Sequence, residues 1–478
     1  MKAENFVVKY YDRFFILTGE KEGELMAKKA WLLALVLGLL LLLGSCGMAS
    51  GDELYSLPKL SSDNYHLQTV IDKIRAQGGE YSAPVNGTNV QSIQMHDLDG
   101  DGVQEAVAFF RFSNDEKPLK VYVFKKLDNE EYEQIALIEG EGNAFNSVRY
   151  ENITGSVQKE IVLTWQLVTA STSRLNNLTV HALGRDGATE LMRTIYTNYQ
   201  ILDMDRDGLS ELAVIHFDST GENSRTELYR AEKESLHLAA SAPLSHGITG
   251  LVQVRVGYLQ EYSPAVFVYA SLEGGGYLTD VFAWQEGQLN NITCDAETGI
   301  SLSTIVQTDL LRMTDINGDG VLELPFPFEL PKKLATEGET ERPTFCGIHW
   351  RQLDREGNLY GVMTTFHNLV DDRYEWYLEM PEAWVGTVAL EREDSTINTR
   401  TVIFSLYTDE ESEPIPFLRI YRFTGSNRQN RATINNRFKL LETPTVIYAA
   451  EFFESSWNCG MNAESLRAAF HLILEEWQ

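Results

Sequence analysis

Three short acidic loops recur along this chain of 478 residues, and an apolar run follows each of them. Each loop carries oxygen-bearing side chains at positions 1, 3, 5 and 9 and glycine at position 6. The loops begin at Asp97, Asp203 and Asp315, and the runs after them read AVAFF, LAVIH and LPFPF. A unit that repeats at near-constant spacing predicts a repeat architecture, which constrains the fold more than any other feature of the sequence.

The spacing within each loop suits a hard cation. Calcium takes six to eight oxygen ligands, and a tight loop can turn alternating carboxylates inward. Glycine at position 6 permits the sharp turn, and the residue at position 7 can offer its backbone carbonyl. The expected calcium ligands are Asp97, Asp99, Asp101, Val103 and Glu105 in the first loop, Asp203, Asp205, Asp207, Leu209 and Glu211 in the second, and Asp315, Asn317, Asp319, Val321 and Glu323 in the third.

Two other interpretations of these loops compete with this one. An EF-hand needs a bidentate Glu at position 12 and flanking helices, but position 12 is Ala108, Val214 or Phe326. The loops could also be acidic turns that bind no ion, because Asp and Gly are common turn residues. Three carboxylates within five residues repel one another without a cation, which favours the ion. We expect calcium to have a structural role there.

Weaker copies of the unit fill the intervals between the acidic loops. Residues 152–160 keep the position-9 glutamate, Glu160, but lack Asp, and the strand near Pro264 follows a loop with no ligand pattern. The equivalent positions Glu105, Glu160, Glu211, Pro264 and Glu323 are separated by 55, 51, 53 and 59 residues. A four-stranded propeller blade takes about 40–50 residues, so the spacing predicts one blade per repeat.

The pattern D-x-[DN]-x-D-G-x-x-E before an apolar strand resembles the FG-GAP/VCBS repeat, which builds the β-propeller of integrin α chains and of many bacterial surface proteins. In that family the loop joins the first two strands of a blade. The resemblance implies a mainly β fold in which residues 88–367 form a propeller of about five four-stranded blades. In the first blade we expect strands at 91–96, 105–112, 119–126 and 132–138. A sixth, divergent blade or a β-sandwich are the alternatives.

An export signal is expected before the repeats. A basic pair, Lys28 and Lys29, precedes the apolar run 30–43, which is shorter than the roughly 20 apolar residues of a membrane-spanning helix. The run ends in LGSC, which resembles the bacterial lipobox and implies cleavage before Cys46 and a diacylglycerol on its thiol. The alternative is an uncleaved membrane helix.

This signal predicts where the protein resides. Met26 is the expected true start, so that residues 1–45 comprise a spurious extension and the signal peptide, and residues 46–60 form a lipidated tether. We expect the protein to be exported and anchored by its lipid to the outer face of a bacterial cell membrane.

The regions on either side of the repeats have their own character. Residues 61–87 contain an amphipathic helix, which we expect to pack on the propeller through Leu67, Val70, Ile71 and Ile74. Residues 372–478 are expected to form a smaller α+β domain that ends in a helix over 462–477. Its Pro381-x-x-Trp384 motif faintly resembles Mog1/PsbP-like domains.

Charge and cysteine content exclude several classes of protein. The net charge of −29 argues against nucleic acid as a partner. Four cysteines are too few for a disulfide-built fold. Outside the cell Cys294 and Cys346 could form a disulfide, and the alternative is two unpaired thiols.

The sequence shows no nucleophile elbow, metalloprotease motif or phosphate-binding loop, so we do not expect an enzyme. The expected function is that of a cell-surface, calcium-binding module that binds or scaffolds an extracellular protein or glycan. A polysaccharide hydrolase or lyase on the same scaffold, and an envelope sensor or accessory subunit, are the alternatives.

Overall fold

The computed structural model describes residues 65–168, 174–220, 223–232, 235–305, 311–333, 343–371, 373–396 and 398–473. The expected signal peptide, the lipidation site Cys46 and the tether 46–60 lie outside these residues. Within the described ranges, no helix is long and apolar enough to cross a membrane. The chain divides into two compact units, Met1–Asp72 and Lys73–Gln478, and every sheet lies in the second.

The described part of the chain begins with helix α4 (Tyr65–Ala76), inside the range expected to contain a helix. Leu67, Ile71 and Ile74 are buried, as the apolar face of the sequence predicts.

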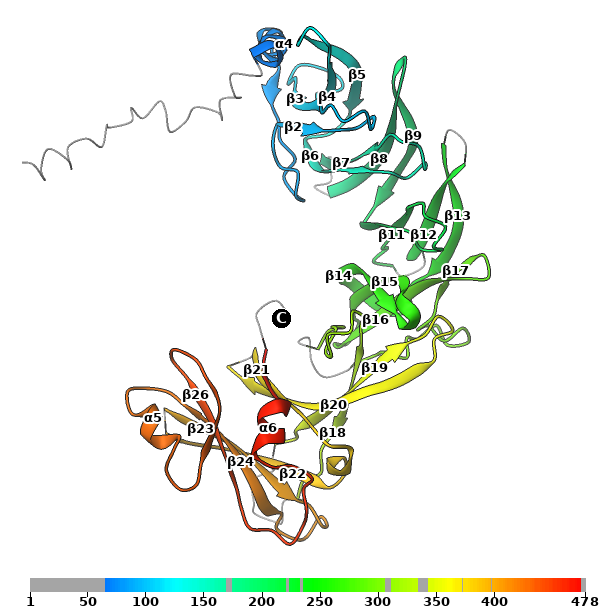
Figure 1. The fold of residues 1–478 in the computed structure, drawn as a ribbon. Coiled ribbons are helices and arrows are strands. Elements are labelled where there is room, and N and C mark those ends of the chain that lie inside the picture. Colours follow the sequence, from blue (N-terminus) through cyan, green and yellow to red (C-terminus); the bar gives the residue numbers. More distant parts are fainter. Residues whose placement is uncertain are drawn as a thin grey trace, which may run out of the picture. The chain divides into compact units, whose positions relative to one another are not determined.

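The fold is mainly β, as predicted, and consists of successive antiparallel sheets (Figure 1). The first sheet contains β1 (Glu80–Tyr81), β2 (Ile93–His96), β3 (Glu105–Arg111), β4 (Leu119–Lys126) and β5 (Tyr132–Gly140). The second contains β6 (Ala144–Glu151), β7 (Glu160–Val168), β8 (Arg174–Gly184) and β9 (Gly187–Tyr196). The third contains β10 (Asn198–Leu202), β11 (Glu211–His216), β12 (Arg225–Glu232) and β13 (Ser235–Pro243).

The fourth sheet contains β14 (Ile248–Leu259), β15 (Ser263–Leu272), β16 (Tyr277–Gln285) and β17 (Gln288–Asn291), with the short helix η2 (Gln260–Tyr262) between β14 and β15. The fifth contains β18 (Leu324–Glu329), β19 (Cys346–Leu353), β20 (Leu359–Val370), β21 (Arg373–Glu379) and β27 (Phe470–Leu472). The strands expected in the first unit are confirmed as β2 to β5. The predicted spacing is also confirmed, because β3, β7, β11, β15 and β18 begin at or within one residue of the five equivalent positions.

The strand after each loop carries an apolar run, and in β3 and β11 this run is buried on both faces. In β11, Leu212 and Val214 pack in one core with residues of the second sheet. The alternating residues Ala213 and Ile215 pack in another core with residues of the fourth sheet. Similar cores join the first sheet to the second and the fourth to the fifth. Consecutive sheets therefore pack face to face.

A sixth sheet lies in the C-terminal region. It contains β22 (Val388–Thr396), β23 (Thr399–Leu406), β24 (Ile415–Phe423), β26 (Ile447–Phe452) and β25 (Phe438–Glu442), in that order. The helices η3 (Glu382–Trp384), α5 (Arg428–Arg431) and α6 (Ala463–Ala469) accompany it. Asn462 caps α6, as expected, through bonds from the N–H groups of Glu464 and Ser465.

The C-terminal region is joined to the fifth sheet. Strand β21 pairs with β20, and β27 pairs with β21, so strand pairing crosses the expected boundary at 367–372. One apolar core contains Phe366 and Trp376 of the fifth sheet and Val402 and Ile420 of the C-terminal sheet. The helix expected over 462–477 ends at Ala469, because the chain from Phe470 pairs as a strand instead.

Candidate metal-binding loops

Each acidic loop lies between two antiparallel-paired segments of the chain. The first lies between β2 and β3, and the second between β10 and β11. The third lies between Thr314 and Glu323, which form an isolated antiparallel bridge before β18. The hairpin geometry brings the first and last residues of each loop together.

The position-9 glutamate is buried at the base of every acidic loop. Glu105 and Glu323 have exposed fractions of 0%, and Glu211 of 2%. Each carboxylate accepts the backbone N–H of position 2, at 2.8 Å from Leu98, 2.7 Å from Met204 and 2.9 Å from Ile316. Burial raises the pKa of Glu211 and Glu323 to about 7, and it also raises the pKa of Glu105. A cation beside such a carboxylate would favour its anionic form.

The position-1 aspartate closes the turn. Asp97 accepts the backbone N–H groups of Gly100 at 2.8 Å and Gly102 at 3.1 Å. Asp315 accepts those of Gly318 at 2.7 Å and Gly320 at 2.9 Å. These bonds hold the carboxylates in place, so a cation would find part of its ligand set already positioned.

The loops bring carboxylate oxygens together in groups whose ligand atoms lie within 4.8 Å of one another. The groups are Asp97, Asp99 and Asp101, then Asp203, Asp205 and Glu211, and finally Asp315, Asp319 and Glu323. Oε1 of Glu105 and Oδ1 of Asp203 are buried without a hydrogen-bond partner in the described structure. Oxygen-only donor sets of this size fit a hard divalent cation such as calcium.

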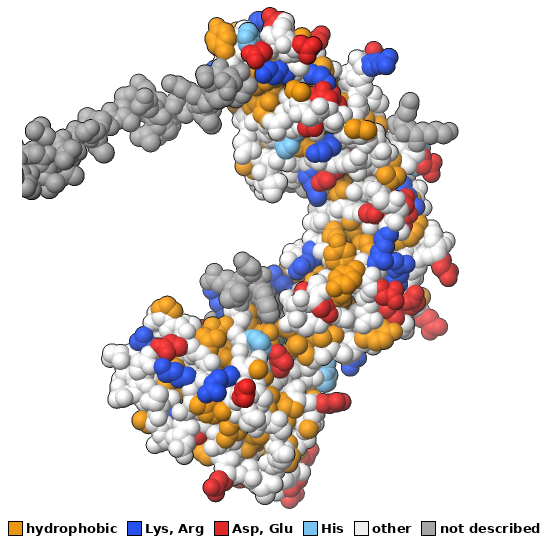
Figure 2. All heavy atoms as spheres, viewed as in Figure 1, with side chains coloured by type: hydrophobic (Ala, Val, Ile, Leu, Met, Phe, Trp, Pro, Cys, Tyr) orange, Lys and Arg blue, Asp and Glu red, His pale blue; other side chains and the backbone are white. Residues whose placement is uncertain are grey.

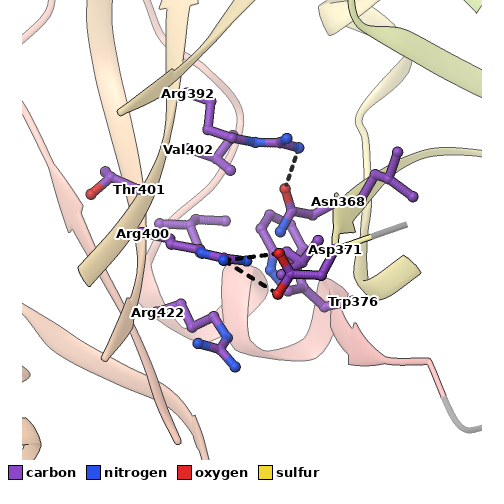
Figure 3. Close-up of a pocket in the computed structure, with 11 residues that line it drawn as sticks. Asn368, Asp371, Trp376, Arg392, Arg400, Thr401, Val402 and Arg422 are labelled. Carbon is purple, nitrogen blue, oxygen red and sulfur yellow. Dashed lines mark hydrogen bonds and ion pairs between the residues drawn. The ribbon is translucent and has the colours of Figure 1, made fainter. Parts of the chain in front are cut away.

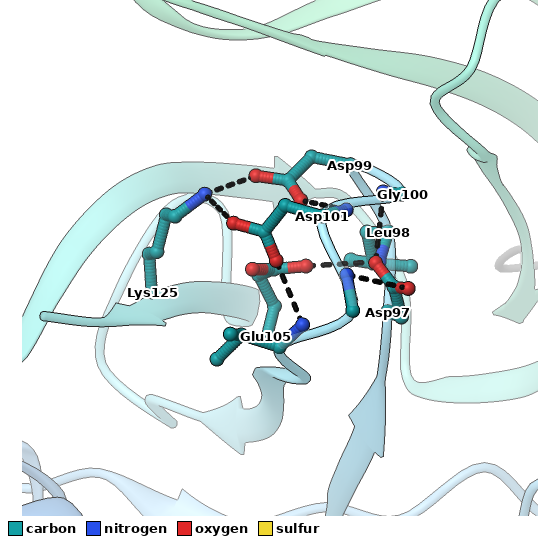
Figure 4. Close-up of polar contacts among 9 residues, drawn as sticks. Asp97, Leu98, Asp99, Gly100, Asp101, Glu105 and Lys125 are labelled. Carbon is teal, nitrogen blue, oxygen red and sulfur yellow. Dashed lines mark hydrogen bonds and ion pairs between the residues drawn. The ribbon is translucent and has the colours of Figure 1, made fainter.

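A side chain from the neighbouring strand lies against each of these groups. In the first loop Lys125 of β4 pairs with Asp99 and donates to Asp101 at 2.8 Å (Figure 4). Its hydrogen bond lowers the pKa of Asp101. Figure 4 shows the ammonium group of Lys125 directed toward both carboxylates, with Glu105 beside them. An internal cation therefore already offsets part of the charge of this loop.

The other two loops have a different residue at the equivalent place. Arg230 of β12 pairs with Asp205, and its Nε lies 3.4 Å from Oε1 of Glu211. Gln352 of β19 donates through Nε2 to Asp319 and to Glu323, both at 2.8 Å.

Strand register explains why these three residues are equivalent. In β3 and β4, Ala106 pairs with Phe124, so the next residue on each strand places Glu105 beside Lys125. The corresponding pairs in the other sheets place Arg230 beside Glu211 and Gln352 beside Glu323. The first acidic loop therefore faces a lysine, the second an arginine and the third a neutral glutamine.

The degenerate loop 152–160 provides an internal comparison. Glu160 is buried like its equivalents and accepts the N–H of Ile153 at 2.8 Å. Its other oxygen accepts a hydrogen bond from the hydroxyl of Thr154 at 2.6 Å. Hydroxyl and backbone groups therefore satisfy both oxygens of Glu160 in a loop that lacks the aspartates.

The loops also contact an adjacent sheet: the first two contact the following sheet, and the third contacts the preceding one. Lys159, the residue before β7 of the second sheet, donates its backbone N–H to the carbonyl of Leu98 in the first loop at 2.7 Å. Arg206 donates to the carbonyl of Glu261 at 2.6 Å, and the hydroxyl of Tyr262 donates to the carbonyl of Asp319 at 2.8 Å. An ordered loop therefore stabilises the contact between consecutive sheets.

A polar cavity of about 620 Å³ lies among the first three sheets. Its lining includes Asn89 before β2, Asn146, Ser147 and Arg149 of β6, and Tyr199 of β10. The side chain of Asn89 donates to the carbonyl of Val148 at 3.3 Å. Amide, hydroxyl and guanidinium groups thus line one concave surface.

Several predicted site residues need separate mention. Asp207 lies outside the group of its loop but accepts the N–H of Leu209 at 2.8 Å, and Asn317 accepts that of Asp319 at 2.9 Å. The carbonyl ligands at Val103, Leu209 and Val321 stay predictions. Lys125, Arg230 and Gln352 were not predicted from the sequence.

Cys294 and Cys346 form no disulfide, so the alternative of two thiols outside a disulfide describes them. The backbone of Cys294 forms an isolated antiparallel β-bridge with Ser301, whereas Cys346 is paired with Glu329 on neighbouring strands of the fifth sheet.

Comparisons with known proteins give only distant likenesses. No protein-family model matches the chain, and no curated protein matches it. Among solved structures, a rhamnogalacturonan lyase of Bacillus licheniformis is similar at a TM-score of 0.27 and 11% identity, over 68% of this chain and 70% of that one. A candidate 6-phosphogluconolactonase of Bacteroides uniformis is similar at a TM-score of 0.25 and 12% identity, over 67% of this chain and 82% of that one.

Proposed function

We propose that this chain is an exported, lipid-anchored binding module of the FG-GAP/VCBS propeller type, with calcium in its three acidic loops. The observation that carries the proposal is the repetition of one loop geometry in three separate sheets. Each time a buried glutamate accepts the N–H of position 2, and carboxylate oxygens gather within 4.8 Å. The face-to-face packing of consecutive sheets is the packing expected of propeller blades.

Calcium has a structural role in this proposal. Asp97, Asp203 and Asp315, with the carboxylates near them, would hold the ion and order each loop. Because each loop contacts an adjacent sheet, an ordered loop strengthens the contacts between blades. The ion also offsets the cost of burying the position-9 glutamate as an anion.

The proposed ligand is a glycan that binds in the polar cavity of the first three sheets. Amide, hydroxyl and guanidinium groups can hydrogen-bond to sugar hydroxyls, and these groups line the cavity. Its volume of about 620 Å³ lies in the range typical of ligand sites.

Thermal unfolding of the purified protein in calcium, magnesium and chelator tests the calcium sites. A ligand that binds only the folded state raises stability by about 2.7 kcal/mol at 100 times Kd. We expect a rise specific to calcium, which the triple substitution Glu105→Gln, Glu211→Gln and Glu323→Gln abolishes. Glu160→Gln is the matched control, because it alters the same position in the loop without aspartates, and it should leave the rise unchanged. An equal response to magnesium, or no response, would contradict the proposal.

A glycan array tests the ligand. We expect a defined set of oligosaccharides to bind, and Tyr199→Phe to weaken binding because it removes one hydroxyl from the cavity. Binding that Tyr199→Phe leaves unchanged would place the ligand elsewhere. The lipid anchor is tested separately by incorporation of labelled fatty acid in a bacterial host, which Cys46→Ser should abolish.

A further inference from the structure

A second pocket, of about 130 Å³, lies between the fifth sheet and the C-terminal sheet. Three arginines line one side of it: Arg392 of β22, Arg400 of β23 and Arg422 of β24. Figure 3 shows the guanidinium groups of Arg392 and Arg400 directed toward Asn368 of β20 and Asp371 in the turn after it. On the face shown in Figure 2, Lys and Arg side chains also gather over the C-terminal sheet. Such a concentration is unexpected in a chain with a net charge of −29.

Strand register forces the three arginines onto one face of the sheet. Arg400 pairs directly with Arg422, and Arg392 pairs with Val402, two residues along β23 from Arg400. Like charges directly opposite each other destabilise a sheet. Asp371 is the one acidic residue among the described residues that line the pocket. The arrangement therefore favours an added anion.

The contacts of the arginines differ in how easily a ligand could replace them. Arg422 donates to Glu375 at 2.6 Å, and these side chains are 24% and 21% exposed. Arg400 donates to the two carboxylate oxygens of Asp371 at 3.1 and 3.3 Å, but the side chain of Asp371 is 80% exposed. An ion pair that exposed is weak, so another carboxylate can take the place of Asp371.

The same face of the C-terminal sheet also gives the pocket an apolar part. Val402 and Ile420, both in the shared core, line it with exposed fractions of 3% and 2%. A carboxylate on a carbon skeleton can contact the arginines and the edge of these apolar side chains together, whereas a bare inorganic anion contacts only the arginines. Guanidinium groups match the planar geometry of a carboxylate.

We propose that this pocket binds a carboxylate-bearing organic ligand, with Arg400 as its main contact and the Asp371 carboxylate as the internal group that the ligand displaces. Arg392, which donates to Asn368 at 3.0 Å, supplies further positive charge at the pocket. The site is separate from the calcium loops and from the glycan cavity, so it gives the C-terminal region a binding function of its own.

Isothermal titration calorimetry of the full-length protein at low ionic strength tests the proposal, with D-glucuronate, acetate, D-glucose and inorganic phosphate as probes. We expect D-glucuronate or acetate to bind and D-glucose not to bind. Arg400→Gln should weaken binding by about tenfold or more. Asp371→Asn should strengthen it by about two- to fivefold, because it removes the competing carboxylate. Arg419→Gln is the matched control, because Arg419 lies on the opposite face of β24 against Phe453.

The outcomes separate cleanly. Tighter binding of D-glucuronate than of acetate identifies a uronic sugar, and the reverse identifies a small free acid. Phosphate binding without carboxylate binding would overturn the assignment. No binding to either the wild type or Asp371→Asn would overturn it too, and Asp371→Asn carries little risk of unfolding because the residue is exposed. Equal binding by Arg400→Gln and wild type would show that the ligand is elsewhere.

Discussion

Arg230 contacts two carboxylates, those of Asp205 and Glu211, that a calcium ion in the second acidic loop would need as ligands. It pairs with Asp205 and lies near Glu211, whereas the third loop has the neutral Gln352 at the equivalent place. Arg230 must therefore give up both contacts before an ion can bind. We expect Arg230→Gln to raise the calcium affinity of the second loop.

The size of the effect follows from how exposed the contacts are. The side chain of Arg230 is 27% exposed, that of Asp205 is 16% exposed and that of Glu211 is 2% exposed. Ion pairs with this partial exposure each contribute about 0.5–1 kcal/mol. Losing two of them should favour calcium by about 1–2 kcal/mol, which corresponds to about a 5- to 30-fold lower Kd.

Terbium luminescence can follow this loop alone. The ring of Trp284 lies 4.3 Å from the guanidinium carbon of Arg230, so it can sensitise a lanthanide in the second loop, and calcium is then measured by competition. A background with Glu105→Gln and Glu323→Gln disables the other two loops. The reciprocal change, Gln352→Arg, should weaken the third loop by a similar factor, measured by calcium titration calorimetry in a background with Glu105→Gln and Glu211→Gln. An unchanged or weaker affinity in Arg230→Gln would refute the idea that the arginine competes with calcium.

Three further predictions follow from buried or strained residues. Burial raises the pKa of Glu323 to about 7 from 4.5, so in chelator its contribution to stability is present below pH 4.5 and is lost as the pH rises through 7. Urea titrations should therefore show the Glu323→Gln variant to be more stable than wild type above pH 7, and the two proteins to converge near pH 4.5. A parallel pH dependence of the two proteins would contradict this. Burial lowers the pKa of His367 to about 3 from 6.5, so its contribution to folding stability is present above pH 6.5 and is lost as the pH falls toward 3. His367→Phe should therefore reduce the loss of unfolding free energy between pH 6.5 and pH 3. An unchanged loss of stability in that pH range would contradict this prediction. Gly155 has a φ of +75°, and an added Cβ would lie 2.6 Å from a methyl carbon of Leu209. Gly155→Ala should therefore lower the free energy of unfolding, measured by chemical denaturation, by about 1–3 kcal/mol. A neutral result would show that the contact between the second and third sheets is not tight.

The sequence predicted the strands and the loops because both depend on local patterns. A tight turn needs its glycine and aspartates at set positions, and the strand after it is apolar because both faces are buried. Equivalent positions at Glu105 and Glu211, for example, therefore located β3 and β11 correctly. The degenerate unit near Pro264 was placed by its apolar strand and by the repeat spacing, without a ligand pattern, and β15 begins at Ser263.

Features that depend on pairing between distant residues were not predicted. Lys125 and Arg230 face their loops only because of hairpin register, and the hairpins differ in length. The arginine pocket forms only where strands β22, β23 and β24 of the C-terminal sheet meet the turn between β20 and β21 of the fifth sheet. The helix over 462–477 was predicted too long, because Phe470 fits helical periodicity but gains more from pairing with Leu378. Tertiary pairing overrode local pattern at that position.

The most direct test of the account is a crystal structure of the protein grown in calcium, with anomalous diffraction used to locate the ion. We predict anomalous peaks inside the loops that begin at Asp97, Asp203 and Asp315, with the position-7 carbonyls among the ligands, and no peak in the loop 152–160. Three loops without an anomalous peak at saturating calcium, with Lys125 and Arg230 still on their carboxylates, would contradict the central claim.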